Sequence, residues 1–241
     1  MTSFSTCLAP PTLGRLLAAS LCATVAGGGC GPSAPAQTSE TTEGVGSTAT
    51  TIVYLNGGGA TLIGGGEQSD AAADLVEGEF PAGAFAEADS VRFAALTEQL
   101  QADFAAYPIE ITTRRPPAGT DYMMLVVAAQ PTPIQGFISL AGLDCGNGNA
   151  RDVGLLFDDP SAPPSPQRLA RGAAYAIGLM LGVYPTGEPS DAMFPALGEG
   201  AVEFVDACLP VATTIECEPE PSGCESGSSN SYLELQGALG I

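Results

Sequence analysis

The chain of 241 residues contains no histidine, no lysine and no tryptophan. Without histidine or lysine it cannot form a Ser-His-Asp triad, a Cys-His pair, a Schiff-base lysine, a Ser-Lys dyad or a phosphate-binding loop with its lysine. The lack of histidine also leaves only carboxylates, thiolates and tyrosines as side-chain ligands for a metal ion. These absences exclude most hydrolase and nucleotide-dependent chemistry.

Positive charge is scarce as well. Seven arginines are the only cationic side chains, against 27 aspartates and glutamates, which gives a formal net charge of −20. Nucleic-acid binding depends on basic side chains that neutralise phosphates, so we expect no nucleic-acid partner. The hydrophobic share of 45%, together with 31 glycines and 20 prolines, predicts one sizeable core with many turns.

The N-terminal segment has the layout of an export signal. A short polar region ends at Arg15, the apolar run Leu16–Ala26 is too short to cross a bilayer, and three glycines precede Cys30. We expect residues 1–29 to be a signal peptide and Cys30 to be the lipid-attachment cysteine of a bacterial lipoprotein, with simple secretion as the alternative. Residues 30–50 would then be the anchor and a flexible tether. The expected location is the cell envelope, at the outer membrane, with the lipid as the membrane contact.

Four cysteines remain once the two in the expected signal and Cys30 are set aside. They are Cys145, Cys208, Cys217 and Cys224. An even number of cysteines in an exported chain predicts two disulfides, and we favour Cys217 with Cys224 and Cys145 with Cys208. A zinc site built from four thiolates is the rival interpretation, although the chain has no C-x-x-C pair.

Periodicity predicts an α/β domain over residues 51–241. Residues 51–63 are expected to form a β-hairpin that turns at Asn56-Gly57, and residues 109–111, 122–129 and 152–157 to form strands, with 122–129 at the sheet centre. Arg114 and Arg115 are expected to end the first of these strands in solvent. An amphipathic helix is expected from Asp89 or Ser90, with an apolar stripe that includes Phe93, Leu96, Leu100, Phe104 and Tyr107.

The second helix carries the most informative spacing. It is expected from Gln167 onward, with Gly178 as its end. Zinc peptidases of the metzincin type carry H-E-x-x-H-x-x-G-x-x-H, in which two histidines one helical turn apart and a third after the glycine bind zinc. In the same frame this chain has Arg171, Gly172, Tyr175, Gly178 and Leu181. The glycine is kept, and the three ligands and the general base are absent.

A second feature follows in the same order. Residues 191–195 read DAMFP, which resembles the Met-turn beneath the metal site of the same family, with Met193 as its methionine. Residues 51–241 therefore resemble a metzincin-type domain. The resemblance implies a zincin-like mixed twisted sheet packed by two main helices (51–183) and a smaller, irregular C-terminal subdomain with disulfides (184–241). Gly178 and Met193 would be structural relics.

The resemblance also implies lost chemistry. Guanidinium, leucine and glycine groups can neither bind zinc nor accept a proton from water, so we expect no zinc and no peptidase activity. Our first hypothesis is a binding or inhibitory module for an unknown protein or peptide at the cell surface. In it, Arg171 and Tyr175 hold a carboxylate or a peptide end in the former substrate cleft, or an edge strand takes up an extended peptide. The alternatives are a hydrolase that uses carboxylates or calcium, and a purely structural envelope lipoprotein.

Overall fold

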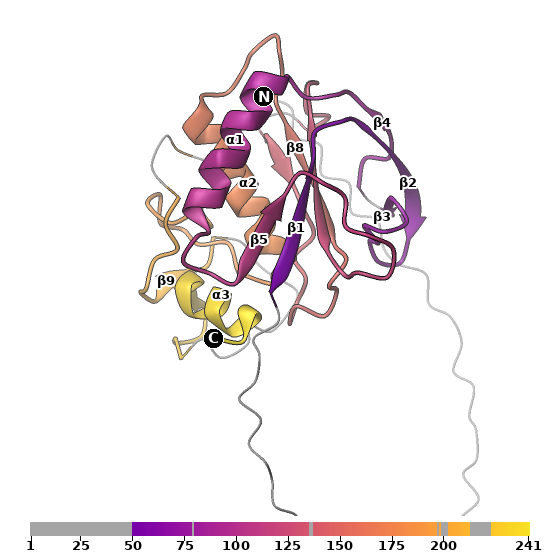
Figure 1. Cartoon of the computed structure of the whole chain (residues 1–241). Coiled ribbons are helices and arrows are strands. Elements are labelled where there is room, and N and C mark those ends of the chain that lie inside the picture. Colours follow the sequence, from indigo (N-terminus) through magenta and orange to yellow (C-terminus); the bar gives the residue numbers. More distant parts are fainter. Residues whose placement is uncertain (1–49, 79, 135–136, 197, 199–201, 213–222) are drawn as a thin grey trace, which may run out of the picture. The chain divides into compact units, whose positions relative to one another are not determined.

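A five-stranded sheet organises the fold (Figure 1). The computed structural model describes residues 50–78, 80–134, 137–196, 198, 202–212 and 223–241; the expected signal, Cys30, almost all of the expected tether and Cys217 lie outside these residues. The strand order is β5-β1-β6-β8-β7, with β7 antiparallel to β8 and all other pairs parallel. The strands are β1 (Thr51–Asn56), β5 (Ile109–Thr112), β6 (Met123–Ala128), β7 (Ser139–Leu140) and β8 (Val153–Phe157).

Both faces of this sheet are covered, as the continuous apolar sequences of β6 and β8 require. Every residue of these two strands is buried. Helices α1 (Ser90–Asp103) and α2 (Pro166–Met180) lie on one face, where Leu125 and Leu156 pack into one core with Leu100 and Ile177. A small sheet of β2 (Ala60–Gly66), β3 (Leu75–Glu77) and β4 (Gly83–Phe85) lies on the other face (Figure 1). The predicted mixed sheet, its central strand and its two main helices are confirmed.

The expected hairpin at Asn56-Gly57 is wrong. Strands β1 and β2 belong to different sheets, so the chain crosses here from the main sheet to the small one. A Cβ atom on Gly57 would lie 2.6 Å from Cε2 of Phe93, and the positive φ in this stretch belongs to Gly59. Gly57 therefore serves the close approach of α1 and not a two-residue turn.

Helix α1 begins where the sequence predicted. The Asp89 carboxylate accepts hydrogen bonds from the amides of Val91 and Arg92, which caps the helix. Helix α2 is capped by Ser165, with Pro166 in its first turn.

The expected end of α2 at Gly178 is wrong. The helix continues to Met180, and the residue in the left-handed region is Gly182, with φ of 79°. A Cβ atom on Gly182 would also lie 2.6 Å from the carbonyl oxygen of Asp144. Gly178 lies inside the helix, and a Cβ atom there would collide with the sulfur of Met193. Its small size is required for packing and not for a turn.

The C-terminal part packs on the same core as the helices. Helix α3 (Ser231–Leu239) contributes Leu235 and Leu239 to that core, and β9 (Leu209–Pro210) pairs with β10 (Ser228–Ser229). A disulfide joins Cys208 to Cys224 beside these two strands.

This disulfide corrects the expected cysteine pairing. Both favoured pairs are wrong, because Cys208 and Cys224 are bonded to each other. The same bond overturns the rival interpretation, a zinc site that would need all four thiolates. Cys145 is also disulfide-bonded, which agrees with the expectation that the cysteines of this domain are oxidised.

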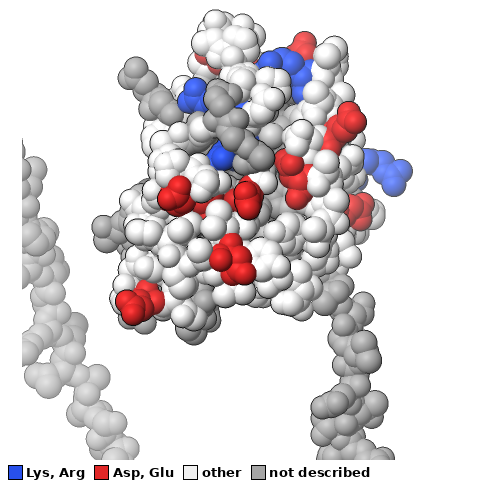
Figure 2. Space-filling view, turned by 90° about the vertical axis from the view of Figure 1, so that its left-hand side faces the viewer, with Lys and Arg blue, Asp and Glu red and all other residues white. Residues whose placement is uncertain are grey.

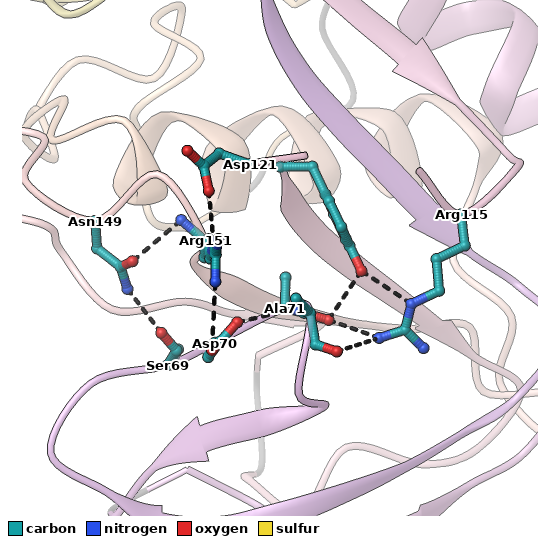
Figure 3. Close-up of polar contacts among 9 residues, drawn as sticks. Ser69, Asp70, Ala71, Arg115, Asp121, Asn149 and Arg151 are labelled. Atoms are coloured by element: carbon teal, nitrogen blue, oxygen red, sulfur yellow. Dashed lines mark hydrogen bonds and ion pairs between the residues drawn. The ribbon is translucent and has the colours of Figure 1, made fainter. Parts of the chain in front are cut away.

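Arg114 and Arg115 are both exposed at the end of β5, as expected, but Arg115 also bonds to the segment before β3. The Arg115 guanidinium donates to the carbonyl oxygen of Ala71 at 2.7 Å (Figure 3). It also donates to the carboxylate of Asp74 at 2.8 Å and to the hydroxyl of Tyr122 at 2.9 Å. These contacts fasten the segment before β3 to the main sheet.

A neighbouring set of polar contacts fastens the same segment to the start of β8. Asn149 donates to the carbonyl oxygen of Ser69 at 2.9 Å, and Arg151 pairs with Asp121 at 2.6 Å (Figure 3). The scarce arginines of this chain thus join segments that are distant in sequence.

A bidentate ion pair joins α1 to the end of β8. Nε and Nη2 of Arg92 donate to the two carboxylate oxygens of Asp158 at 2.6 and 2.7 Å, and Nη2 also donates to the carbonyl oxygen of Pro164. The Asp158 side chain is 4% exposed, whereas that of Arg92 is 31% exposed. Removal of Arg92 would leave a buried carboxylate without its cation.

We therefore predict that Arg92→Ala lowers the free energy of unfolding by about 2–3 kcal/mol. Urea unfolding monitored by circular dichroism measures the loss. Arg114→Ala is the matched control, because Arg114 is exposed and belongs to none of the ion pairs among the described residues. Equal losses in the two variants would contradict the role of this ion pair.

Candidate functional site

The candidate site centres on Arg171, the residue at the first ligand position of the metzincin-like frame. Its side chain is among the largest that are fully buried, with 1% exposure. Nη2 donates to the carbonyl oxygens of Asp191 at 2.6 Å and Pro189 at 3.0 Å. Burial lowers the pKa of Arg171, and the nearby charge of Asp191 opposes this effect. The guanidinium thus joins α2 to the segment that contains the Met-turn-like residues.

The Asp191 side chain is buried near the Arg171 guanidinium and bonds to its own segment and to α3. It has no solvent exposure, and its two carboxylate oxygens accept hydrogen bonds from the Met193 amide and the Ser231 hydroxyl, each at 2.7 Å. Burial raises the pKa of Asp191, and the hydrogen bonds and the charge of Arg171 counteract the rise. We call Arg171, Asp191 and Ser231 the Arg171 cluster.

Helix α3 completes the surroundings of the cluster. The Ser231 hydroxyl accepts from the Val205 amide at 3.0 Å while it donates to Asp191. One turn along α3, the Glu234 carboxylate accepts from the Tyr184 amide at 2.9 Å and from the Ser229 hydroxyl at 2.7 Å. Burial raises the pKa of Glu234. Side chains of α3 therefore satisfy main-chain donors of the segments on either side of the cluster.

Gly178 and Met193, the two positions that the frame keeps, lie against each other. Met193 is fully buried, and its sulfur occupies the space where a side chain on Gly178 would begin. The order of these two residues in the sequence therefore corresponds to a contact in space. Any larger residue at 178 would have to displace Met193 or the helix.

The remaining frame positions hold packing residues. A Cβ atom on Gly172 would lie 3.0 Å from Cδ1 of Ile138, so the general-base position offers little room for a glutamate. Leu181 is 1% exposed and caps the end of α2. Tyr175 is half-buried against the core, and burial raises its pKa to about 12, so it stays neutral near pH 7.

The sequence does not predict the polar side chains around Arg171. Asp191 enters the prediction only as one of the Met-turn-like residues, and Ser231 and Glu234, which bond to Asp191 and to Tyr184, do not enter it. Asp191 has a weak local signal, because an aspartate two residues before an amide that it caps is a common turn arrangement. Ser231 has none, since its contact spans 40 residues of sequence.

A second polar region bears on the alternative that carboxylates bind calcium. A pocket of about 200 Å³, which we call the acidic pocket, is lined by four carboxylates: Glu67, Glu77, Asp144 and Asp152. Within the described part of the chain, no three of the acidic or cysteine side chains are arranged to hold a metal ion. Burial, then the charges of Asp144 and Glu77, raise the pKa of Asp152 to about 7, although a hydrogen bond from Asn149 counteracts this.

The raised pKa of Asp152 predicts a pH dependence of stability. Because the folded state binds this proton more tightly than the unfolded state, stability falls as the pH rises from about 4 to about 7, and then levels off. Asp152→Asn should remove this pH dependence, and at pH 8 the variant should be more stable than the wild type by up to roughly 4 kcal/mol. Urea unfolding at pH 4–8 gives both profiles.

The control for Asp152→Asn is Asp159→Asn. Hydrogen bonds from Ser161 lower the pKa of Asp159, so its loss should leave the slope between pH 4 and pH 7 unchanged. Parallel profiles for the wild type and Asp152→Asn would show that Asp152 does not bind a proton near neutral pH.

A further prediction concerns the stability that the Arg171 cluster provides. Arg171→Met keeps an apolar stem but removes both hydrogen bonds to the Met193 segment and the cation near Asp191, and should cost about 3 kcal/mol of stability. Arg168→Met, one helical turn earlier on α2, makes the same chemical change at a half-buried position and should cost less than about 1 kcal/mol. Thermal and urea unfolding measure both; a milder loss at 171 than at 168 would contradict the role of the cluster.

The identity of this site has to be inferred from its geometry. Comparisons of the chain with protein-family models and with curated proteins find no match. Among the described helices, none is long and apolar enough to cross a membrane.

Proposed function

We propose that the chain is an exported, lipid-anchored domain of metzincin-like fold that has lost zinc peptidase chemistry and acts as a binding or inhibitory module at the cell surface. The observation that carries the proposal is the burial of Arg171. In the metzincin frame this position holds a zinc ligand, whereas here its guanidinium is committed to two main-chain oxygens of the Met193 segment. A positive charge fixed in this place disfavours a metal cation by direct repulsion.

Three further observations support the proposal. The tight space at Gly172, against Ile138, is unsuited to a general base on α2. The mixed sheet with two helices on one face, and the contact between Gly178 and Met193, fit the resemblance to the family.

The burial of Arg171 also changes where a ligand could bind. The sequence alone predicts that its charge is presented in an open cleft, but a side chain with 1% exposure is not available to a partner. The edge of the main sheet is the better candidate. Strand β7 pairs with β8 on one side and with no other described strand, and Ile134 and Phe137, just before it, are 45% and 46% exposed. A partner peptide could add to this edge as a further strand.

The first test is chemical. Elemental mass spectrometry of the oxidised full chain should find no stoichiometric zinc or calcium, and a broad peptide and glycan panel should show no hydrolysis. Stoichiometric zinc would overturn the proposal. Hydrolysis that a single Asp or Glu substitution abolishes would replace it with a carboxylate-dependent or calcium-dependent hydrolase.

The second test locates the partner. A photo-crosslinking residue at Phe137, in cells that export the full chain, should capture an envelope protein or peptide. The same residue at Val91, which is 75% exposed on α1, is the matched control and should capture none. Equal capture at both positions, or none at 137 together with a deletion phenotype confined to envelope integrity, would favour a purely structural lipoprotein.

A further inference from the structure

A cavity of about 380 Å³ lies where β6 and β8 end and α2 begins, apart from the Arg171 cluster. In open α/β sheets, ligands bind beyond the carboxyl ends of parallel strands, and β6 and β8 are a parallel pair. The volume of the cavity lies within the range of about 300–1,000 Å³ that is typical of small-ligand pockets. Six of its lining residues carry the argument: Pro131, Pro133, Phe137, Phe157, Asp159 and Arg168.

The cavity contains a guanidinium without an acidic partner. Arg168 belongs to none of the four ion pairs among the described residues, which use Arg92, Arg115 and Arg151. Its Nε is buried and makes no hydrogen bond in the described structure. The terminal nitrogens of Arg168 are not among the buried atoms, so they are the donors that a ligand in the cavity can reach, and a carboxylate is the strongest acceptor for them.

Most other walls of the cavity are apolar. Phe157 is buried at the end of β8, while Phe137, also in the lining, is 46% exposed. Three prolines, Pro131, Pro133 and Pro164, give it rigid sides. The cavity therefore suits a ligand in which one carboxylate is attached to an aromatic or aliphatic group.

One acidic residue shares the cavity and limits the affinity for an anion. Asp159 accepts hydrogen bonds from the amide and the hydroxyl of Ser161 at 2.8 and 2.7 Å. These bonds lower the pKa of Asp159, so it carries a negative charge near pH 7. Figure 2 shows one face of the molecule, on which carboxylates lie across the middle and arginines in the upper half. On so acidic a chain, a carboxylate ligand needs a specific cation, and Arg168 supplies one.

We propose that this cavity binds the C-terminal carboxylate of a peptide that ends in an aromatic or aliphatic residue, with the Arg168 guanidinium as partner of the carboxylate and Phe137 and Phe157 as the walls for the side chain. The inference gives the proposed binding module its ligand class and in that respect rests on the proposed function. The binding of a carboxylate in this cavity depends neither on the absence of zinc nor on the burial of Arg171. The further inference and the proposed function can therefore fail separately.

The test uses two probes that differ only in charge. N-acetyl-L-phenylalanine has the carboxylate, and its amide, N-acetyl-L-phenylalaninamide, does not. Titration of the isotope-labelled full chain, followed by amide chemical shifts, should show saturable binding of the acid at residues around Phe137, Phe157 and Arg168, with a dissociation constant of about 1 mM or below. The amide should bind about tenfold more weakly or worse. Equal binding of the two probes, or no saturation with either, would overturn the proposal.

Three variants assign the effect to residues. Arg168→Gln should weaken the acid about tenfold and remove its advantage over the amide, with an unchanged unfolding temperature. Asp159→Asn should tighten binding of the acid several-fold, because a like charge is removed; this variant keeps the test open if Arg168→Gln folds poorly. Arg114→Gln, at an exposed arginine, should change neither the affinity for the acid nor its advantage over the amide. If Arg168→Gln keeps the preference for the acid, or Asp159→Asn weakens it, the assignment is wrong.

Discussion

A guanidinium charge inside the core is the constraint on which the C-terminal half of this fold depends. Arg171 lies on the buried face of α2, where an unpartnered cation would be strongly unfavourable. Two main-chain oxygens of the 189–191 segment accept from it, and Asp191 supplies a nearby negative charge. Asp191 in turn is held by Ser231 at the start of α3. The helix, the Met193 segment and the last helix are thus fixed by one continuous set of polar contacts.

The scarcity of cations makes each described arginine informative. Arg92, Arg115 and Arg151 join segments that lie far apart in the sequence, and Arg171 does so through main-chain oxygens. Arg114, Arg168 and Arg171 belong to none of the ion pairs among the described residues. Arg114 is exposed and Arg171 donates to main-chain oxygens, whereas Arg168 lines a cavity, which is why it points to a ligand outside the chain.

The sequence predicted the parts of the fold that depend on local pattern. Both main helices and the buried strands β6 and β8 follow from periodicity and caps, because these signals lie within the segments themselves. The errors arose where distant packing decided the outcome. Gly57 accommodates Phe93 from α1, and Gly178 accommodates Met193, so both glycines were mistaken for turn residues. The disulfide pairing failed for a similar reason, because spacing alone does not determine connectivity.

At the candidate site, the sequence identified the frame positions but not what they do. Position 171 holds an arginine where the metzincin frame has a histidine, and the sequence therefore predicts no zinc chemistry; the structure adds that this arginine is buried and bonded to Pro189 and Asp191. The central claim is that Arg171 and Asp191 stabilise each other in the core. A double-mutant cycle with Arg171→Met and Asp191→Asn, by urea unfolding, measures this coupling. We predict a coupling free energy of about 1 kcal/mol or more. A coupling near zero would mean that the two groups do not depend on each other, which would contradict the account.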